Sequence, residues 1–493
     1  MQKKQTILVV ASLLLVVLSV TLAYFTAQII GKGKDVSVSS ADLKIIFTDS
    51  DGAISGSNIE PGWSDTKTFT VENNSKSEYK YNIVIKDLLN TFVTNGYLQY
   101  KITSTNGGYN MTEFKDVPKS SVATDTILAY SVVIPNGVTQ SYTIEFKYVN
   151  DESVDQSDDM GKKLSGKLFI TEGTEDPNKT LYNQLLADKS TKLTRTDFST
   201  VLTTNNTKTL YTGVEDSKTV YYFAGNATDN WVKFGKNASN QDIYWRIIRT
   251  NSDGGVRLLY HGTSTTATDA YIGTSTFNSS YNNIAYVSYM YGNLGSVANA
   301  RENTTDSTIK TIIDNWYKDN LNTNYGKYLS TTAVYCNDRS TSDNAYFGAY
   351  TRLITNKTPS YDCAATEDKF TVDSTVGNGK LTYPIALMTA DEVSFAGGVY
   401  GTNAPTWYYY NSANGSSTGS TWWWLLSPNF WDGSRAGVFF VGGSSFPGSF
   451  SGDYVGNTGN VRPAISLKSC IKYSTGNGSA SDPYTIKETA SGC

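Results

Sequence analysis

The sequence predicts a multidomain chain with an N-terminal membrane or signal helix, then an all-β sandwich, then an α+β domain. Three observations predict this order. An uncharged apolar run lies near the N-terminus, short alternating strands follow to about residue 172, and helical patterns join the strands after about residue 209. A chain of 493 residues also exceeds what one hydrophobic core usually holds, so several domains are expected.

Residues 1–31 carry the expected export signal. Lys3 and Lys4 precede an uncharged stretch over residues 5–31, and about 20 apolar residues are enough to cross a bilayer as a helix. The positive flank keeps the N-terminus in the cytoplasm, so the rest of the chain is expected outside the membrane. Two outcomes stay open: cleavage as a signal peptide near Ala23, or retention as a transmembrane anchor.

The charge balance argues against nucleic acid as a partner. The chain has 41 Lys and Arg against 45 Asp and Glu, a net charge of −4, and 17% charged residues. It therefore offers no basic stripe for a phosphate backbone. The 35 tyrosines and 41 glycines are instead typical of exported β-rich proteins.

Residues 35–172 predict a β-sandwich. Their strand segments alternate polar with apolar residues, which marks strands with one buried face, and turn signals rather than helices separate them. Strands at this spacing indicate two packed antiparallel sheets. The segments are residues 41–47, 67–71, 79–85, 98–102 and 142–146.

Short motifs at residues 23–26, 58–62 and 68–75 resemble a known family. Residues 1–172 are similar to camelysin and TasA-like proteins, which are exported sandwich proteins of Gram-positive bacteria, some of them subunits of biofilm matrix fibres. The resemblance implies a structural module capable of self-assembly. The metalloprotease activity described for camelysin is not carried over, because the chain lacks a His-Glu-x-x-His motif and this segment contains no histidine.

Residues 173–208 predict a helical linker. Asp176 is expected as an N-cap with Pro177 in the first turn, and Leu181, Leu185 and Leu186 fall on one helical face.

Residues 209–493 predict an α+β domain. One helix is expected after a cap at Asp306 or Ser307, and a second begins at the capping-box pattern of residues 389–392 and ends at Gly397. The apolar face of the first helix is Ile309, Ile312, Ile313, Trp316 and Leu321. Strands are expected at residues 219–223, 231–234, 243–249, 256–260, 407–410, 422–426, 437–441 and 461–467.

The pieces at residues 422–428, 434–438 and 460–467 resemble an uncharacterised domain of exported proteins of Gram-positive gut bacteria. More distantly, the order of elements is similar to the C-type-lectin-like fold of formylglycine-generating enzymes and bacterial variable receptors. The resemblance implies that strands 422–426, 437–441 and 461–467 share one sheet. The copper-binding cysteine pair of the enzymes has no matching context here, so that activity is not carried over.

The cysteines predict disulfides. All lie in the C-terminal part, and an even number in an exported chain indicates bridges, although the sequence leaves three connectivities open. Sequence neighbours are the expected pairs, Cys336–Cys363 and Cys470–Cys493, with Cys493 as a free thiol the alternative.

The sequence shows no catalytic constellation or cofactor site. His261 is the only histidine, and a lone histidine at a strand end is expected to be structural. Zinc would need Cys and His ligands, which are scarce. Calcium held by scattered carboxylates such as Asp432 or Asp453 stays open. The protein is therefore not expected to be an enzyme.

A ligand-binding surface is expected in the aromatic loops at residues 429–435 and 445–457, which the lectin-like resemblance places near one another. Rings beside polar groups on surface loops are typical of recognition sites for a glycan or protein. The sequence thus favours an exported surface or secreted binding protein, with a matrix or fibre subunit and an enzyme with an unfamiliar site as alternatives. The candidate ligand-binding residues are Phe430, Trp431, Asp432, Arg435, Phe446, Phe450, Asp453 and Tyr454.

Overall fold

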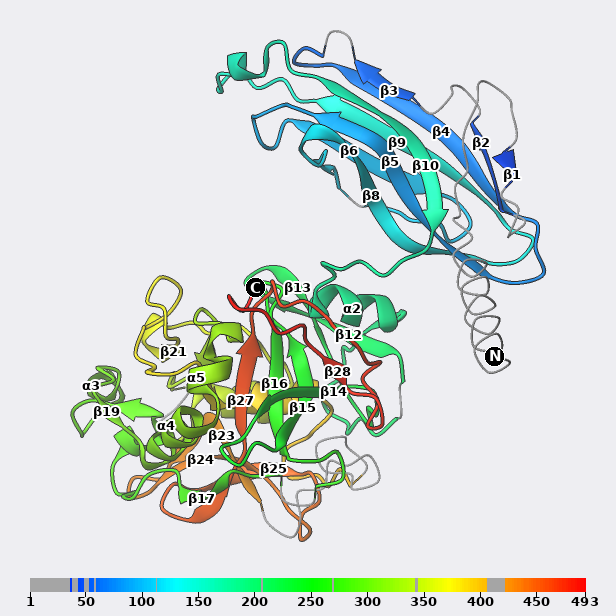
Figure 1. The fold of residues 1–493 in the computed structure, drawn as a ribbon. Coiled ribbons are helices and arrows are strands. Elements are labelled where there is room, and N and C mark those ends of the chain that lie inside the picture. Colours follow the sequence, from blue (N-terminus) through cyan, green and yellow to red (C-terminus); the bar gives the residue numbers. More distant parts are fainter. Residues whose placement is uncertain are drawn as a thin grey trace, which may run out of the picture. The chain divides into compact units, whose positions relative to one another are not determined.

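The computed structural model describes two compact units, residues 1–177 and 178–493 (Figure 1). The described residues are 36–37, 43–47, 53–56, 59–111, 113–204, 207–267, 270–341, 345–405 and 422–493. The predicted helix within residues 1–31 and the predicted strand at residues 407–410 lie outside them. No helix in the described ranges is long and apolar enough to cross a membrane.

The first unit, called the sandwich unit below, consists of two antiparallel sheets, as predicted (Figure 1). One sheet has the order β1 (Val36–Ser37), β2 (Leu43–Phe47), β4 (Ser64–Asn73), β9 (Thr139–Tyr148), β6 (Leu98–Ser104) and β7 (Lys115–Asp116). The other has the order β3 (Ala53–Gly56), β10 (Leu164–Glu172), β5 (Tyr79–Asn90) and β8 (Ser120–Ile134).

Alternation along the strands builds the core of the sandwich unit. In β9, Tyr142, Ile144 and Phe146 are buried, while the residues between them are half-buried. Period-two alternation sends successive side chains to opposite faces, so each strand contributes one row to a common interior. Tyr81 of the facing sheet joins that interior, and its hydroxyl lies 2.6 Å from the Tyr142 hydroxyl.

Most of the segment predicted as a linker, from residue 178 on, belongs to the second unit. The helix α2 (Leu181–Asp188) buries Leu181 and Leu185 in the core of that unit, and β11 (Thr191–Thr194) pairs parallel with β12 (Thr209–Glu215). The predicted N-cap at Asp176 is wrong. Thr180 caps the helix, because its side chain accepts a hydrogen bond from the backbone N–H of Asn183.

A nine-stranded sheet forms the centre of the second unit. Its main path runs β11-β12-β13-β15-β16-β27-β22, and β14 pairs with both β15 and β28. In Figure 1, β27 from near the end of the chain lies beside β16 from the middle. The strands are β13 (Lys218–Tyr222), β14 (Trp231–Lys236), β15 (Asp242–Thr250), β16 (Val256–Gly262), β22 (Ile385–Leu387), β27 (Pro463–Leu467) and β28 (Tyr484–Thr485).

A five-stranded sheet carries the aromatic strands. Its order is β17 (Gly273–Thr276), β26 (Thr458–Val461), β23 (Trp423–Trp431), β24 (Ala436–Val441) and β25 (Phe450–Tyr454). The expectation that residues 461–467 join this sheet as one strand is wrong, because the segment divides at Arg462. Val461 ends β26 in this sheet, while β27 enters the nine-stranded sheet, and the Arg462 guanidinium binds the Tyr260 carbonyl oxygen at 2.8 Å.

The helix α4 (Thr308–Asn320) begins after Ser307, whose side chain caps it as predicted. Its buried face differs from the prediction: Ile312 is exposed, whereas Lys310 and Asp314 are buried and joined by an ion pair of 2.6 Å. Because Lys310 and Asp314 neutralise each other, both charged side chains can be buried. The spacing of apolar residues alone therefore could not predict the buried face of α4.

The helix α7 (Ala390–Phe395) has the predicted capping box, formed by Thr389 and Glu392. Short elements complete the second unit: β18 (Met290–Tyr291), α3 (Val297–Ala300), β19 (Thr305–Asp306), α5 (Asn322–Tyr325), β20 (Tyr335–Cys336), α6 (Gly348–Tyr350), the π-helix η4 (Thr351–Asn356) and β21 (Lys369–Phe370). Further 3₁₀ turns are η1 (Ser157–Asp159) in the sandwich unit and η2 (Ile284–Val287), η3 (Gly326–Tyr328) and η5 (Thr366–Asp368) in the second.

Both predicted disulfides are present. Cys336 pairs with Cys363 and Cys470 pairs with Cys493, so none of the four cysteines, all within the described ranges, is free. Two bridges of this kind are typical of an oxidising, extracellular environment.

Candidate functional site

The structure brings together only part of the predicted ligand-binding set. Phe430, Asp432, Arg435 and Tyr454 meet at the end of β24 that begins with Ala436, because Gly437 pairs with Tyr454 on β25. Asp453 is on the same stretch of β25, and its carboxylate accepts a hydrogen bond from the Asn457 side chain.

The predicted loops 429–435 and 445–457 are partly strand, because Phe430 and Trp431 end β23 and residues 450–454 form β25. Phe450 and Trp431 are not exposed loop residues, and Phe446 is exposed in a loop but lies apart from the rest of the set. Phe450 is buried, 1% exposed, because β25 pairs it with Val441 and its ring packs on Phe439. Trp431 belongs to β23 rather than a loop, and its ring packs against the core. Phe446 is 63% exposed, but it lies in the connection between Val441 and β25, at the opposite end of β24.

A glycine aligns two rings of the site. Phe430 pairs with Gly437 on one side, and Gly437 pairs with Tyr454 on the other. A Cβ at Gly437 would come within 2.2 Å of the Phe430 ring, so only glycine leaves room for that ring over the central strand. The rings of Phe430 and Tyr454 meet edge to face, with centroids 5.6 Å apart.

The turn between β23 and β24 holds a cation over the Tyr454 ring. The Asp432 carboxylate accepts hydrogen bonds from the backbone N–H groups of Ser434 and Arg435, and Arg435 Nε donates to Asp432 Oδ2 at 3.0 Å. The Ser434 and Arg435 contacts lower the pKa of Asp432 to about 2. The Arg435 guanidinium lies 4.0 Å from the centroid of the Tyr454 ring, so the exposed cation is held in place.

Tyr281 extends this surface, and sequence reasoning missed it. It is 49% exposed, its ring lies against Gly456, and its carbonyl oxygen accepts a hydrogen bond from the Ala436 N–H. No local signal links Tyr281 to the other residues of this surface, which lie about 150 or more positions farther along the chain. We call the surface formed by Tyr281, Phe430, Asp432, Arg435 and Tyr454 the aromatic face.

A second polar site lies beside the Cys336–Cys363 disulfide. Glu392 Oε1 accepts hydrogen bonds from Arg249 Nε at 2.9 Å and from Arg257 at 2.8 Å, and Arg249 also pairs with Glu215 at 2.7 Å. Burial alone would raise the pKa of Glu392, but Arg257 and Arg249 outweigh it and hold that pKa below its ordinary value. We call these four residues the charged centre.

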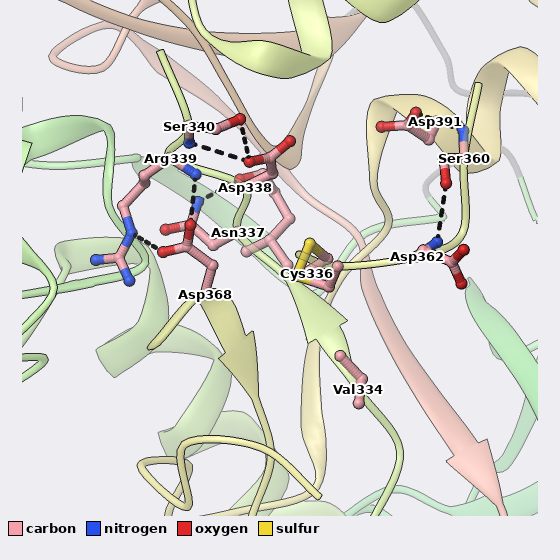
Figure 2. The surroundings of a disulfide bond; sticks show 12 residues. Val334, Cys336, Asn337, Asp338, Arg339, Ser340, Ser360, Asp362, Asp368 and Asp391 are labelled. Carbon is pink, nitrogen blue, oxygen red and sulfur yellow. Dashed lines mark hydrogen bonds and ion pairs between the residues drawn. A yellow bond between two sulfur atoms is a disulfide. The ribbon is translucent and has the colours of Figure 1, made fainter. Parts of the chain in front are cut away.

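Two further ion pairs that share one arginine lie beside the disulfide. Arg352 joins Asp338 on one side and Asp391 on the other, at 2.5 and 2.9 Å. Figure 2 shows Asp338 and Asp362 close to the bridge. A cavity of about 20 Å³, room for a water molecule, lies between these groups and the charged centre.

A larger cavity of about 340 Å³ opens next to the disulfide, which we call the hairpin pocket. Turns of two hairpins form much of its wall, and the side-chain amide of Asn251 there has no protein partner within the described part of the chain. Its other lining residues are Glu215, Asp216, Lys218, Ser252, Asp253, Thr332, Ala333, Val334, Tyr361, Cys363, Lys369 and Val376.

His261 lies in neither site. It is buried, its ring meets that of Trp231 edge to face at 4.5 Å, and its Nδ1 lies 3.2 Å from a nitrogen of Arg462. Burial, with Arg462 and Arg246 nearby, puts the pKa of His261 well below its ordinary value. Across the described residues, no group of three or more His, Cys, Asp and Glu side chains is arranged to hold a metal ion.

These features define a β-rich, disulfide-bridged protein of two units, and the comparisons with known proteins add little. No family model and no curated protein matches the chain. A similar solved structure is a ruminal GH26 endo-beta-1,4-mannanase, at 15% identity and a TM-score of 0.15, over 28% of this chain and 28% of that chain. A likeness this weak carries no argument about fold or activity.

Proposed function

We propose that the chain is an exported binding protein, secreted or held at the cell surface, whose aromatic face meets a glycan or protein ligand. The observation that carries the proposal is the Arg435 guanidinium, fixed 4.0 Å over the Tyr454 ring by its ion pair with Asp432. The apolar run at residues 1–31 and the two disulfides support export.

The chemistry of the aromatic face suits recognition rather than turnover. Rings offer apolar area for stacking on a sugar or filling a partner's pocket, and Arg435 and Asp432 offer directional, charge-assisted hydrogen bonds. Because the turn already orders Arg435, little side-chain freedom is lost on binding. As proposed, the protein binds a ligand without a cofactor and is not an enzyme.

The test is a screen of the full-length protein against glycan and extracellular-protein arrays, followed by titration of the hit with variants. Arg435→Ala and Tyr281→Ala should each weaken binding about thirtyfold, since truncating a central anchor typically costs about 2 kcal/mol. Phe446→Ala is the matched control, because this exposed ring lies at the other end of β24 and should leave the affinity unchanged.

One result of the titrations would contradict the proposal. A ligand that tolerates both Arg435→Ala and Tyr281→Ala does not use the aromatic face. Trp431→Ala is unsuitable for this test, because the ring packs against the core and its loss would also lower stability.

A second candidate function, a subunit of an extracellular matrix or fibre, rests on strand β8. This 15-residue strand lies at one edge of its sheet, and Val122 on it is 70% exposed. An exposed edge can template pairing with another copy. Light scattering and electron microscopy test this: wild type should form fibres, and Val122→Lys should suppress them.

A further inference from the structure

We propose that the hairpin pocket binds a small zwitterion, an amino acid or short peptide with a free ammonium and a free carboxylate. The inference stands on the pocket alone and does not depend on the aromatic face.

The size of the hairpin pocket fits a small molecule. Its volume of about 340 Å³ lies at the lower end of the range of about 300–1,000 Å³ that is typical of ligand pockets. Ala333, Val334 and Val376 supply apolar wall, and the Cys336–Cys363 bridge fixes the segment that carries Cys363. The pocket is therefore formed before a ligand arrives.

The β12–β13 turn at the pocket is strained and held by hydrogen bonds. Glu215 pairs with Lys218, which leaves Asp216 and Ser217 as the loop, and their φ angles are 50° and 63°. Positive φ at both positions of a two-residue hairpin loop favours Asn, Asp or Gly at the first position and Gly at the second, so Ser217 is the strained residue. Such strain persists only where the surroundings impose it, and it clusters at ligand-binding sites.

Two neighbours impose this conformation. The backbone N–H of Asp216 donates to Asp362 Oδ1 at 2.8 Å, and the backbone N–H of Ser252 donates to Glu215 Oε2 at 2.6 Å. The Ser252 hydroxyl also bonds to the Asp216 carboxylate, at 3.3 Å. The two hairpin turns are thus tied together, which fixes the Asp216 carboxylate at the wall of the pocket.

The charges on the wall have both signs. Glu215 is neutralised by Arg249, but Asp216, Asp253, Lys218 and Lys369 form no ion pair within the part of the chain that the structure describes. Asp216, Asp253 and Lys218 are exposed, and Lys369 is half-buried. Two carboxylates and two ammonium groups therefore face one cavity without cancelling each other in pairs.

This charge pattern selects the ligand class. A ligand ammonium can pair with Asp216 or Asp253, and a ligand carboxylate with Lys218 or Lys369, each by charge-assisted hydrogen bonds. A purely anionic ligand would meet the two carboxylates, and a purely cationic one the two lysines, so each would lose part of its attraction. A zwitterion satisfies both pairs at once.

The experiment titrates the full-length protein with dialanine by isothermal calorimetry. Parallel titrations use N-acetyl-dialanine, which lacks the ammonium, and dialanine amide, which lacks the carboxylate. We expect each blocked form to bind at least about tenfold more weakly than dialanine, equivalent to losing one ion pair of about 1.4 kcal/mol. Inorganic phosphate is included as the purely anionic probe and should also bind more weakly.

Variants locate the binding. Lys369→Gln should weaken dialanine binding about tenfold and leave the binding of dialanine amide, which lacks the carboxylate, unchanged. Asp253→Asn should also weaken dialanine binding about tenfold and leave the binding of N-acetyl-dialanine, which lacks the ammonium, unchanged. The matched controls are Lys318→Gln and Asp319→Asn, which alter exposed charges on α4 outside the pocket. Thermal denaturation of each variant shows that it folds.

The proposal is overturned if dialanine fails to bind at about 10 mM, or if blocked and free dipeptides bind equally. Tighter binding of phosphate than of dialanine would also overturn it, since the pocket would then be an anion site. Arg435→Ala should leave dialanine binding unchanged, so failure here and failure of the aromatic face are distinguishable.

Discussion

The two units differ in the polar and charged side chains that they bury. Among the described residues of the sandwich unit, the buried polar side chains are mainly amides, and Asp159 is the one buried charged side chain. The second unit buries a set of charges and bridges its longer connections with two disulfides. Its buried charged residues include Arg246, Arg249, Arg257, Arg339, Arg462, Lys189, Lys310, Glu392 and Asp368.

We infer from this difference that stability depends mainly on apolar packing in the sandwich unit and also on buried ion pairs in the second unit. A sandwich of alternating strands buries apolar rows and satisfies its backbone through the sheets. A unit with short helices and irregular connections leaves more polar groups inside, and each buried charge then needs its partner. Substitutions in each unit test this contrast.

The largest effect is expected at Glu392. Glu392→Gln removes the charge shared by Arg249 and Arg257 and leaves two buried guanidinium groups without it, so the second unit should lose about 3–5 kcal/mol. Asp65→Asn in the sandwich unit is the control, because its ion pair with Lys67 is partly exposed and should cost under about 1 kcal/mol. Urea unfolding with hydrogen exchange by mass spectrometry assigns each loss to its unit. Equal losses of stability from the two substitutions would contradict this difference between the units.

The next effect concerns the Cys336–Cys363 disulfide. Cys336→Ser opens a loop with a sequence separation of 27 and should destabilise the second unit by about 3 kcal/mol on the chain-entropy account. Reduction with dithiothreitol should lower the melting temperature of the second unit and leave the sandwich unit, which contains no cysteine, unchanged. Calorimetry in both redox states measures this, and a shift of both transitions would contradict it.

A smaller effect is expected from acid at His261. The unfolded chain binds its proton near pH 6.5, whereas the folded-state pKa of His261 is well below that, so the unfolded state takes up the proton first as pH falls. The second unit should be fully stable above about pH 6.5 and lose up to about 1.4 kcal/mol per pH unit below it. His261→Gln should flatten this slope between pH 6.5 and 5 in urea titrations. An unchanged slope would assign the loss to other groups.

The smallest effect is expected in the core of the sandwich unit. Ile144→Val removes one buried methylene and should cost about 0.5–1.5 kcal/mol, with no change in the pH dependence of stability. The measurement is urea unfolding at pH 7 and pH 5. A pH-dependent loss would show that the sandwich core is coupled to a titrating group.

Local features of this protein could be predicted from its sequence. Alternation along segments such as 142–146 predicted the sandwich strands, and the pattern at residues 389–392 predicted the capping box of α7. Neighbouring cysteines predicted both disulfides. These features depend on residues close together in the chain, where period, capping chemistry and short loop closure act directly.

The positions of the sites depend on contacts between distant segments and could not be predicted from the sequence. Pairing of Val441 with Phe450 buries that ring and sends Phe446 to the far end of β24, away from Arg435. The charged centre joins Glu215, Arg249, Arg257 and Glu392 from four separate elements, and the hairpin pocket gathers residues spread between positions 215 and 376. Sheet register and ion pairing between distant segments set these positions, and no local pattern encodes either, because both depend on which strands become neighbours.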